Sequence, residues 1–123
     1  MKNNRDILND FGKIIVEQVY DNQYRFIKNS IEDLSRTDEY KNLFNNMSVT
    51  QKNEIENYTK EILQGALFDF LNIFEENEEY RLVYEEEGKQ VNLVEISEML
   101  KAELIIEDGW IDRFSIYSDK NKR

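Results

Sequence analysis

The chain has 123 residues, a length that suits a single domain. It contains no cysteine and no histidine, which excludes disulfides, thiolate chemistry, imidazole bases and zinc sites built on either residue. Its formal net charge is −10, and residues 61–123 hold 16 acidic and 7 basic side chains, a balance that repels the phosphates of nucleic acids.

The first predicted element is one long or slightly broken helix that begins near Asn4 or Asp6 and runs towards Leu34. Its apolar residues form two stripes, one made of Ile7, Leu8, Phe11, Ile14, Ile15 and Val19, and the other of Val16, Tyr20, Tyr24, Ile27, Ile31 and Leu34. The stripes lie more than about 90° apart, and the switch falls near residues 21–23. The helix therefore either kinks there or packs different faces at its two ends, which would suit a homodimer interface.

Two further helices are predicted in the middle of the chain. A short one over residues 40–47 would be capped by Ser35 or Thr37. A long one would begin with the Ser48–Gln51 capping box and run to about Glu75. Residues 62–74 are apolar over most of the helix circumference, which predicts a helix buried in the middle of the domain with a neighbouring helix close to Gly65. Polar residues interrupt this stretch, so it is too short and too polar to cross a membrane.

The last part of the chain mixes strand and helix signals. Residues 80–84 favour a strand that returns after a turn at Gly88, Asn92 and Glu95 cap a helix to about Ile106, and residues 110–117 make a final helical turn or short strand. We expect a mainly α protein: a compact helical bundle with at most one small β-hairpin near residues 80–92. Residues 1–117 would form the domain, and the polar residues 118–123 would fray. With no signal peptide and no cysteine, a cytoplasmic protein is expected.

One acidic motif suggests an enzyme. Residues 75–79 read Glu-Glu-Asn-Glu-Glu and satisfy the E-E-x-x-E spacing of the all-α nucleoside-triphosphate pyrophosphatases, which they resemble in that respect. The resemblance implies carboxylates that hold magnesium against a triphosphate, with residues 95–98 as a second motif that has Glu98 where the family has Asp. The competing interpretation is a solvated acidic helix end, which we favour because glutamate is so frequent in this chain.

Acidic and aromatic residues also occur together. Residues 75–108 hold 12 acidic and 3 basic side chains. Aromatic anchors ringed by carboxylates form a good surface for binding a cationic protein. Trp110 and Phe114 are nevertheless better suited to the core, whereas Tyr80 and Tyr84 suit either place. The predicted partner-binding residues are Glu75, Glu76, Glu78, Glu79, Tyr80, Tyr84, Glu85, Glu86, Glu87, Glu107 and Asp108.

In size, acidity and lack of catalytic residues, the chain resembles the immunity proteins of bacterial toxin systems. Residues 75–87 and 107–114 carry this class-level resemblance. It implies a non-catalytic inhibitor that needs no cofactor or metal and covers the active site of a basic toxin, such as a nuclease. The alternatives are the magnesium-dependent pyrophosphatase and a regulatory adaptor.

Overall fold

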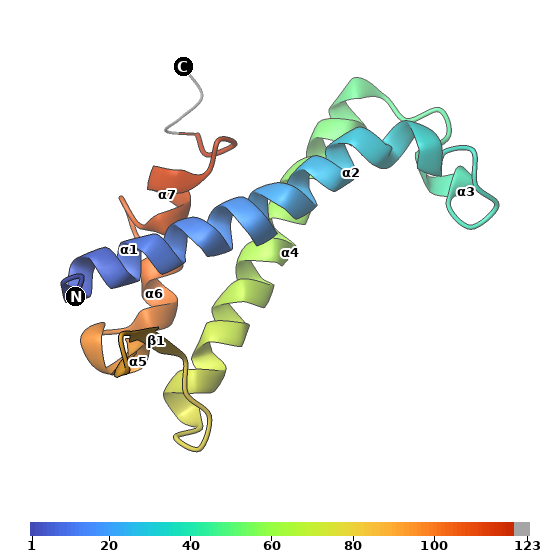
Figure 1. Ribbon diagram of the computed structural model, residues 1–123. Coiled ribbons are helices and arrows are strands. Elements are labelled where there is room, and N and C mark those ends of the chain that lie inside the picture. The colour runs from blue at the N-terminus through green and yellow to red at the C-terminus, as the bar shows by residue number, and fades with distance from the viewer. Residues whose placement is uncertain (120–123) are drawn as a thin grey trace.

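The computed structural model describes residues 1–119. Its N-terminal part is one continuous helical rod made of α1 (Asn4–Ile15), the π-helix η1 (Val16–Tyr20) and α2 (Asp21–Leu34) (Figure 1). Asn3 caps the rod, because its side chain accepts a hydrogen bond from the backbone N–H of Asp6 at 2.8 Å. The prediction of one long, slightly broken helix is confirmed, but the irregular segment lies at residues 16–20 and not at the predicted residues 21–23, which are regular α-helix.

The π-helix explains how the two apolar stripes share one core. The backbone N–H of Asp21 donates to the carbonyl of Val16, five residues earlier, so this turn holds one residue more than an α-turn. One extra residue turns the following stripe back by about 100°. The stripe of α2 is thereby brought towards the stripe of α1, and the residues buried along the rod include Ile7, Leu8, Ile15, Val16, Tyr20, Tyr24 and Ile31.

A short helix and a very long one follow. Helix α4 (Val49–Glu76) begins with the predicted capping box, in which Gln51 N–H donates to Ser48 Oγ at 3.1 Å and Ser48 N–H donates to Gln51 Oε1 at 2.9 Å. Helix α3 (Lys41–Phe44) is shorter than predicted, and no side chain caps it. Of the two predicted caps, Ser35 is wrong because its hydroxyl donates to the carbonyl of Glu32 in the last turn of α2. Thr37 does cap the turn that leads into α3, because its hydroxyl accepts the backbone N–H of Tyr40 at 3.3 Å while it donates to the carbonyl of Leu34.

The C-terminal part begins with the predicted hairpin, β1 (Val83–Glu86) paired antiparallel with β2 (Lys89–Asn92). Glu87 and Gly88 both have positive φ, which gives the tight two-residue turn that suits twisted strands. The helix predicted over residues 93–106 is interrupted: α5 (Leu93–Ile96) ends before α6 (Leu100–Ile105) begins. Glu75 of α4 accepts the backbone N–H of Lys101 at 3.0 Å, so a tertiary contact caps the new start. The chain continues with α7 (Trp110–Phe114).

The core lies where α1, the second half of α4, α6 and α7 meet (Figure 1). Trp110 is completely buried, so it belongs to the core rather than to an exposed surface. Its ring lies against Gly12 of α1 and makes an edge-to-face contact with Phe11, with ring centroids 5.9 Å apart. Helix α2 and the first half of α4 extend beyond this core and carry α3 at their far end (Figure 1). The mainly α fold with one small hairpin is confirmed.

The prediction for residues 62–74 is wrong. Helix α4 buries only one side, with Leu67 and Leu71, and leaves Ile62, Phe70 and Ile73 exposed. No atom lies within 4 Å of a Cβ placed on Gly65, so no neighbouring helix approaches there. The apolar residues of this segment therefore have two locations. Those on one side of α4 face the core, and those on the other side face solvent at the outside of the fold. None of the helices within residues 1–119 has the length and apolarity to cross a bilayer.

A buried carboxylate fixes the end of the described chain. Asp21 accepts hydrogen bonds from Ser115 Oγ and from the backbone N–H of Ile116, at 2.5 and 3.1 Å. Ser118 is buried and donates to the carbonyl of Asp112, so this residue is tied down although it belongs to the segment predicted to fray. Residues 120–123 of that predicted tail lie outside the described residues.

Candidate functional site

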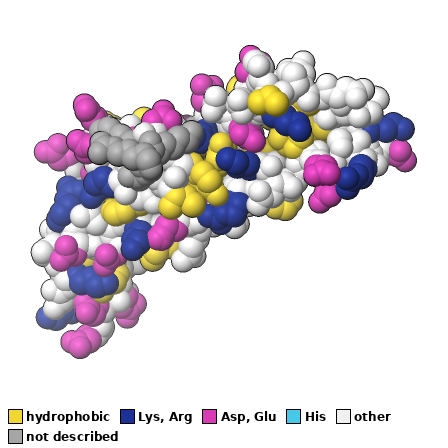
Figure 2. Space-filling view, turned by 90° about the horizontal axis from the view of Figure 1, so that it is seen from above, with side chains coloured by type: hydrophobic (Ala, Val, Ile, Leu, Met, Phe, Trp, Pro, Cys, Tyr) yellow, Lys and Arg dark blue, Asp and Glu magenta, His cyan; other side chains and the backbone are white. Residues whose placement is uncertain are grey.

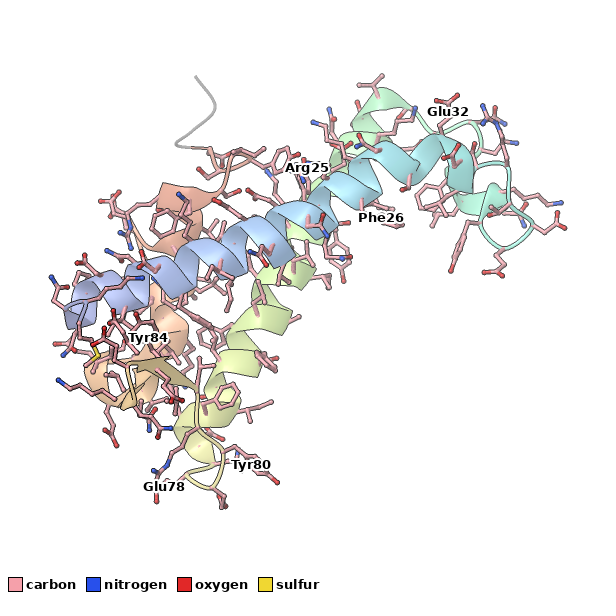
Figure 3. All side chains as sticks on the ribbon, in the orientation of Figure 1. Arg25, Phe26, Glu32, Glu78, Tyr80 and Tyr84 are labelled. Atoms are coloured by element: carbon pink, nitrogen blue, oxygen red, sulfur yellow. The ribbon has the colours of Figure 1, made fainter. Side chains whose placement is uncertain are left out.

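The structure distributes the predicted partner-binding residues over three places. The end of α4 and the turn after it hold Glu75, Glu76, Glu78, Glu79 and Tyr80; the hairpin holds Tyr84, Glu85, Glu86 and Glu87; and the loop between α6 and α7 holds Glu107 and Asp108. Figure 3 labels Glu78 and Tyr80 at the lower end of α4 and Tyr84 beneath α1. The three groups differ in how exposed their side chains are and in which contacts they make.

The first group provides the exposed acidic surface. We call Glu76, Glu78, Glu79 and Tyr80 the acidic end. All four side chains are exposed, and Tyr80 retains 67% of its accessible surface. Within residues 1–119 no hydrogen bond or ion pair engages the three carboxylates, and the last turn of α4 contains no basic residue. The acidic end is therefore a concentration of uncompensated negative charge with an aromatic ring beside it.

Glu75 has a structural role instead. Its carboxylate lies 3.1 Å from Lys101 Nζ and accepts the backbone N–H of the same residue at 3.0 Å, in a largely buried position. Lys101 also donates to Asn72, so this cluster fixes the start of α6 on α4. Among residues 1–119 no group of three acidic side chains is placed to hold a metal ion. The magnesium site implied by the E-E-x-x-E motif stays a prediction that no contact in the structure supports.

A hollow of about 320 Å³ lies beside the acidic end. Glu78 and Tyr80 line it from the turn after α4, and Arg81 and Glu95 contribute charged groups of both signs. The sequence places Glu95 in a helix cap and in the second motif of the pyrophosphatase resemblance, and this hollow does bring Glu95 near Glu78 of the first motif. It gives Arg81 no role, since no local pattern indicates that Arg81 joins them. The hollow offers room for a side chain of a partner next to the exposed carboxylates.

The hairpin residues fasten the hairpin to the N-terminus. Glu86 accepts a hydrogen bond from Tyr84 Oη at 3.1 Å and another from the backbone N–H of Lys2 at 3.3 Å. The ammonium of Lys2 lies 5.5 Å from the centre of the Tyr84 ring and 2.8 Å from Asp10. Partial burial and the hydrogen bond to Glu86 raise the pKa of Tyr84, while the hydrogen bond and charge of Asp10 raise the pKa of Lys2. Tyr84 and Glu86 are therefore engaged internally.

The other two glutamates of the hairpin are more exposed. Glu85 receives one long hydrogen bond from Gln90 at 3.5 Å. Glu87 lies in the turn itself, exposed, with a positive φ. A four-residue strand and the preceding turn separate these carboxylates from the acidic end, so the hairpin forms a second, smaller acidic site.

Glu107 and Asp108 are remote from the acidic end. Helix α6 runs along α4 from Lys101, beside Glu75, to Ile105, which shares a hollow with Gly65. The loop that follows α6 is thus displaced by more than two turns of α4. Asp108 adopts a positive φ and donates its backbone N–H to Asp112 at 2.9 Å, which orders the start of α7.

The structure thus brings four predicted residues together at the acidic end and separates the others. On the face seen in Figure 2 the charges are mixed, with lysine and arginine side chains interspersed with acidic ones. Comparisons with models of protein families, with curated proteins and with solved structures give no match. The geometry of the acidic end is therefore the strongest indication of function in this chain.

Proposed function

We propose that this protein is a non-catalytic, cytoplasmic inhibitor that binds a basic protein through the acidic end, in the manner of an immunity protein that covers a toxin's active site. The observation that supports it is the crowding of Glu76, Glu78 and Glu79 at the C-terminal end of α4 without a basic partner among residues 1–119. This is the end of a helix at which negative charge is unfavourable.

The energetic cost supports a functional interpretation. A carboxylate near a helix C-terminus costs about 0.3–1 kcal/mol, because the helix dipole places partial negative charge there. The crowded glutamates also repel one another. Natural sequences tend to break such local rules at functional sites, where binding uses the group that folding disfavours. A cationic partner would relieve both the dipole and the mutual repulsion.

The mechanism is occlusion. The carboxylates of the acidic end would occupy a cationic groove that otherwise receives phosphate groups, and Tyr80 would insert as an aromatic anchor. The uncompensated charge would speed the encounter, while the desolvated ring would slow dissociation. The hollow beside Glu78 and Tyr80 would receive a basic side chain of the partner.

The test starts from capture of the partner in the native host with the wild-type protein. The recovered protein should be basic, and its association rate should fall steeply between low and physiological salt. A triple variant (Glu76→Gln, Glu78→Gln, Glu79→Gln) should associate more slowly.

The matched control removes the same charge from positions outside the acidic end, namely Glu17→Gln in η1 and Asp38→Asn with Glu39→Gln in the segment before α3. It should keep most of the wild-type association rate. Recovery of a neutral or acidic partner, or equal losses in the two triple variants, would reject the proposal.

A further inference from the structure

The outer side of α4 carries an unpartnered apolar stripe. We call Tyr58, Ile62, Ala66, Phe70 and Ile73 the outer stripe; all five are exposed, and Ile62, Phe70 and Ile73 retain 54%, 50% and 44% of their surface. Successive helical residues are turned by about 100°, so residues 62–73 of this set share a sector of about 80°. That sector points away from the buried Leu67 and Leu71.

Carboxylates follow one edge of the outer stripe. We call Glu54, Glu61, Asp69 and Glu76 the acid row; their spacings of seven and eight residues place them about two turns apart along one edge of α4. All four are exposed. Within residues 1–119 none of them takes part in a hydrogen bond or ion pair. An apolar stripe bordered by unpaired charge of one sign is the pattern of a helix that binds a second, complementary helix.

We propose that the outer stripe and the acid row dock an amphipathic α-helix of the partner, one that carries apolar residues at helical spacing and lysine or arginine along one edge. The inference rests on the proposed function in that the partner is basic, and it adds the shape of the contacting segment. From Tyr58 to Ile73 the stripe extends about 24 Å, which corresponds to roughly four turns of the docked helix.

The charge of the acid row argues against a second copy of this chain. In a two-fold antiparallel pair of α4 helices, the same edge of each helix meets, so one acid row would lie beside the other. In a parallel pair the acid row would meet the opposite edge of α4. Lys52 is the basic residue on that edge, so a single lysine would face four carboxylates. An anionic lipid surface is repelled for the same reason. An amphipathic helix with a basic edge can cover the outer stripe with its apolar face and pair its lysine or arginine side chains with the acid row.

The probe is a labelled 21-residue synthetic helix with leucine on one face and lysine along one edge. Fluorescence anisotropy should show binding to the wild-type protein. Two further peptides test the chemistry: one has glutamate in place of lysine, and the other has the same composition in scrambled order. Both should bind at least about tenfold more weakly. Equal binding of the scrambled peptide would overturn the inference, because it would show attraction by charge alone.

Two variants with matched controls locate the site. Neutralising three of the four carboxylates of the acid row (Glu54→Gln, Glu61→Gln, Asp69→Asn), and leaving Glu76 because it also belongs to the acidic end, should weaken binding of the lysine peptide about tenfold. The equal charge change at the other acidic sites (Glu78→Gln, Glu79→Gln, Glu87→Gln) should weaken it far less. On the outer stripe, the double variant Ile62→Gln with Phe70→Gln should bind the lysine peptide about thirtyfold more weakly. The control Leu43→Gln with Phe26→Gln changes similarly exposed residues outside the stripe and should keep the wild-type affinity.

The outcomes separate this inference from the proposed function. If only the variant at Glu78, Glu79 and Glu87 loses the peptide, the docking site on α4 is wrong and the acidic end remains the binding surface. If sedimentation shows a wild-type dimer that Ile62→Gln with Phe70→Gln dissociates, a second copy covers the stripe and the inference is overturned. Circular dichroism of each variant should retain the wild-type helical signal.

Discussion

At the residue scale, two glycines on long helices have opposite roles. A Cβ placed on Gly12 would lie 2.4 Å from ring atoms of Trp110, whereas one placed on Gly65 meets no atom within 4 Å. Gly12→Ala should therefore destabilise the protein by about 1–3 kcal/mol, because the indole ring must shift. Gly65→Ala should stabilise it by up to about 1 kcal/mol through helix propensity. Urea unfolding of both variants measures the difference, and a stabilised Gly12→Ala variant would contradict the packing described here.

Tyr20 gives the protein a sensitivity to alkaline pH. Burial raises the pKa of its hydroxyl above the ordinary value of about 10, and the nearby charge of Asp21 adds to this effect. The folded state therefore disfavours the phenolate. The free energy of unfolding should stay unchanged by this group below about pH 10 and fall as the pH rises through the raised pKa.

Substitution isolates the contribution of Tyr20. The variant Tyr20→Phe should show a shallower decline of stability above pH 10, although it also loses the 3.3 Å hydrogen bond from Gln64. The control Tyr58→Phe, at a mostly exposed position, should follow the wild type. Chemical denaturation between pH 8 and about pH 11 gives the comparison, and identical slopes for all three proteins would refute the assignment to Tyr20.

At the element scale, η1 is the irregularity that makes the long N-terminal rod fit the core. Deleting the exposed Gln18 should convert η1 into a regular α-turn and rotate α2 by about 100° relative to α1. Tyr24 and Ile31, which are buried on α2 beyond the core cluster, would then become exposed, at a cost of about 1.5–3 kcal/mol each. Thermal unfolding should show a large fall in Tm for the deletion and little change for Gln18→Ala. A deletion variant as stable as the wild type would contradict this role of η1.

Local signals predicted the elements well, and tertiary contacts account for what they missed. The capping box at Ser48 and Gln51 and the turn at Gly88 are properties of a few adjacent residues, so the sequence was enough to find them. The contact between Lys101 and Glu75 joins residues 26 apart, and the one between Lys2 and Glu86 joins residues 84 apart. No local pattern encodes such pairs, which is why Glu75 and Glu86 were predicted on the surface together with Glu78.

The outer side of α4 illustrates the same limit. An all-round apolar helix is usually buried, and the pattern of residues 62–74 was interpreted in that way. A helix with apolar residues on two sides has the same sequence pattern in two situations. Its second side can pack against another part of the same chain, or it can stay exposed and bind another protein. Only the arrangement of α1, α6 and α7 shows that Ile62 and Phe70 lie outside the core.

At the scale of the whole molecule, the net charge of −10 is compensated unevenly. Arg5 pairs with Glu103 at 3.1 Å, and Lys101 pairs with Glu75 at the same distance, so these two carboxylates of the second half are neutralised by the fold. The acidic end is not compensated within residues 1–119. The relevant property is therefore a surplus of charge on α4, densest at its C-terminal end, rather than a continuous field over the second half.

This surplus predicts that removing a carboxylate from the acidic end raises the free energy of unfolding and lowers the rate of association with the partner. Glu76→Gln removes a carboxylate from the last residue of α4, where the helix dipole and neighbouring glutamates oppose it, so the variant should be more stable by about 0.3–1 kcal/mol at low salt. Added salt should shrink the gain, because the repulsion is screened over a Debye length of about 10 Å at 0.1 M. The same substitution should slow association with the basic partner.

Glu32→Gln is the matched control for this prediction. Glu32 lies in the last turn of α2 but is paired with Arg36 at 2.9 Å, so its loss should give little or no gain in stability and leave the association rate unchanged. Urea unfolding at two salt concentrations, combined with association kinetics, tests both halves of the prediction on the same proteins. If Glu76→Gln were less stable than the wild type, the carboxylate would have a structural partner, and the acidic end would lose its strongest argument for a role in binding.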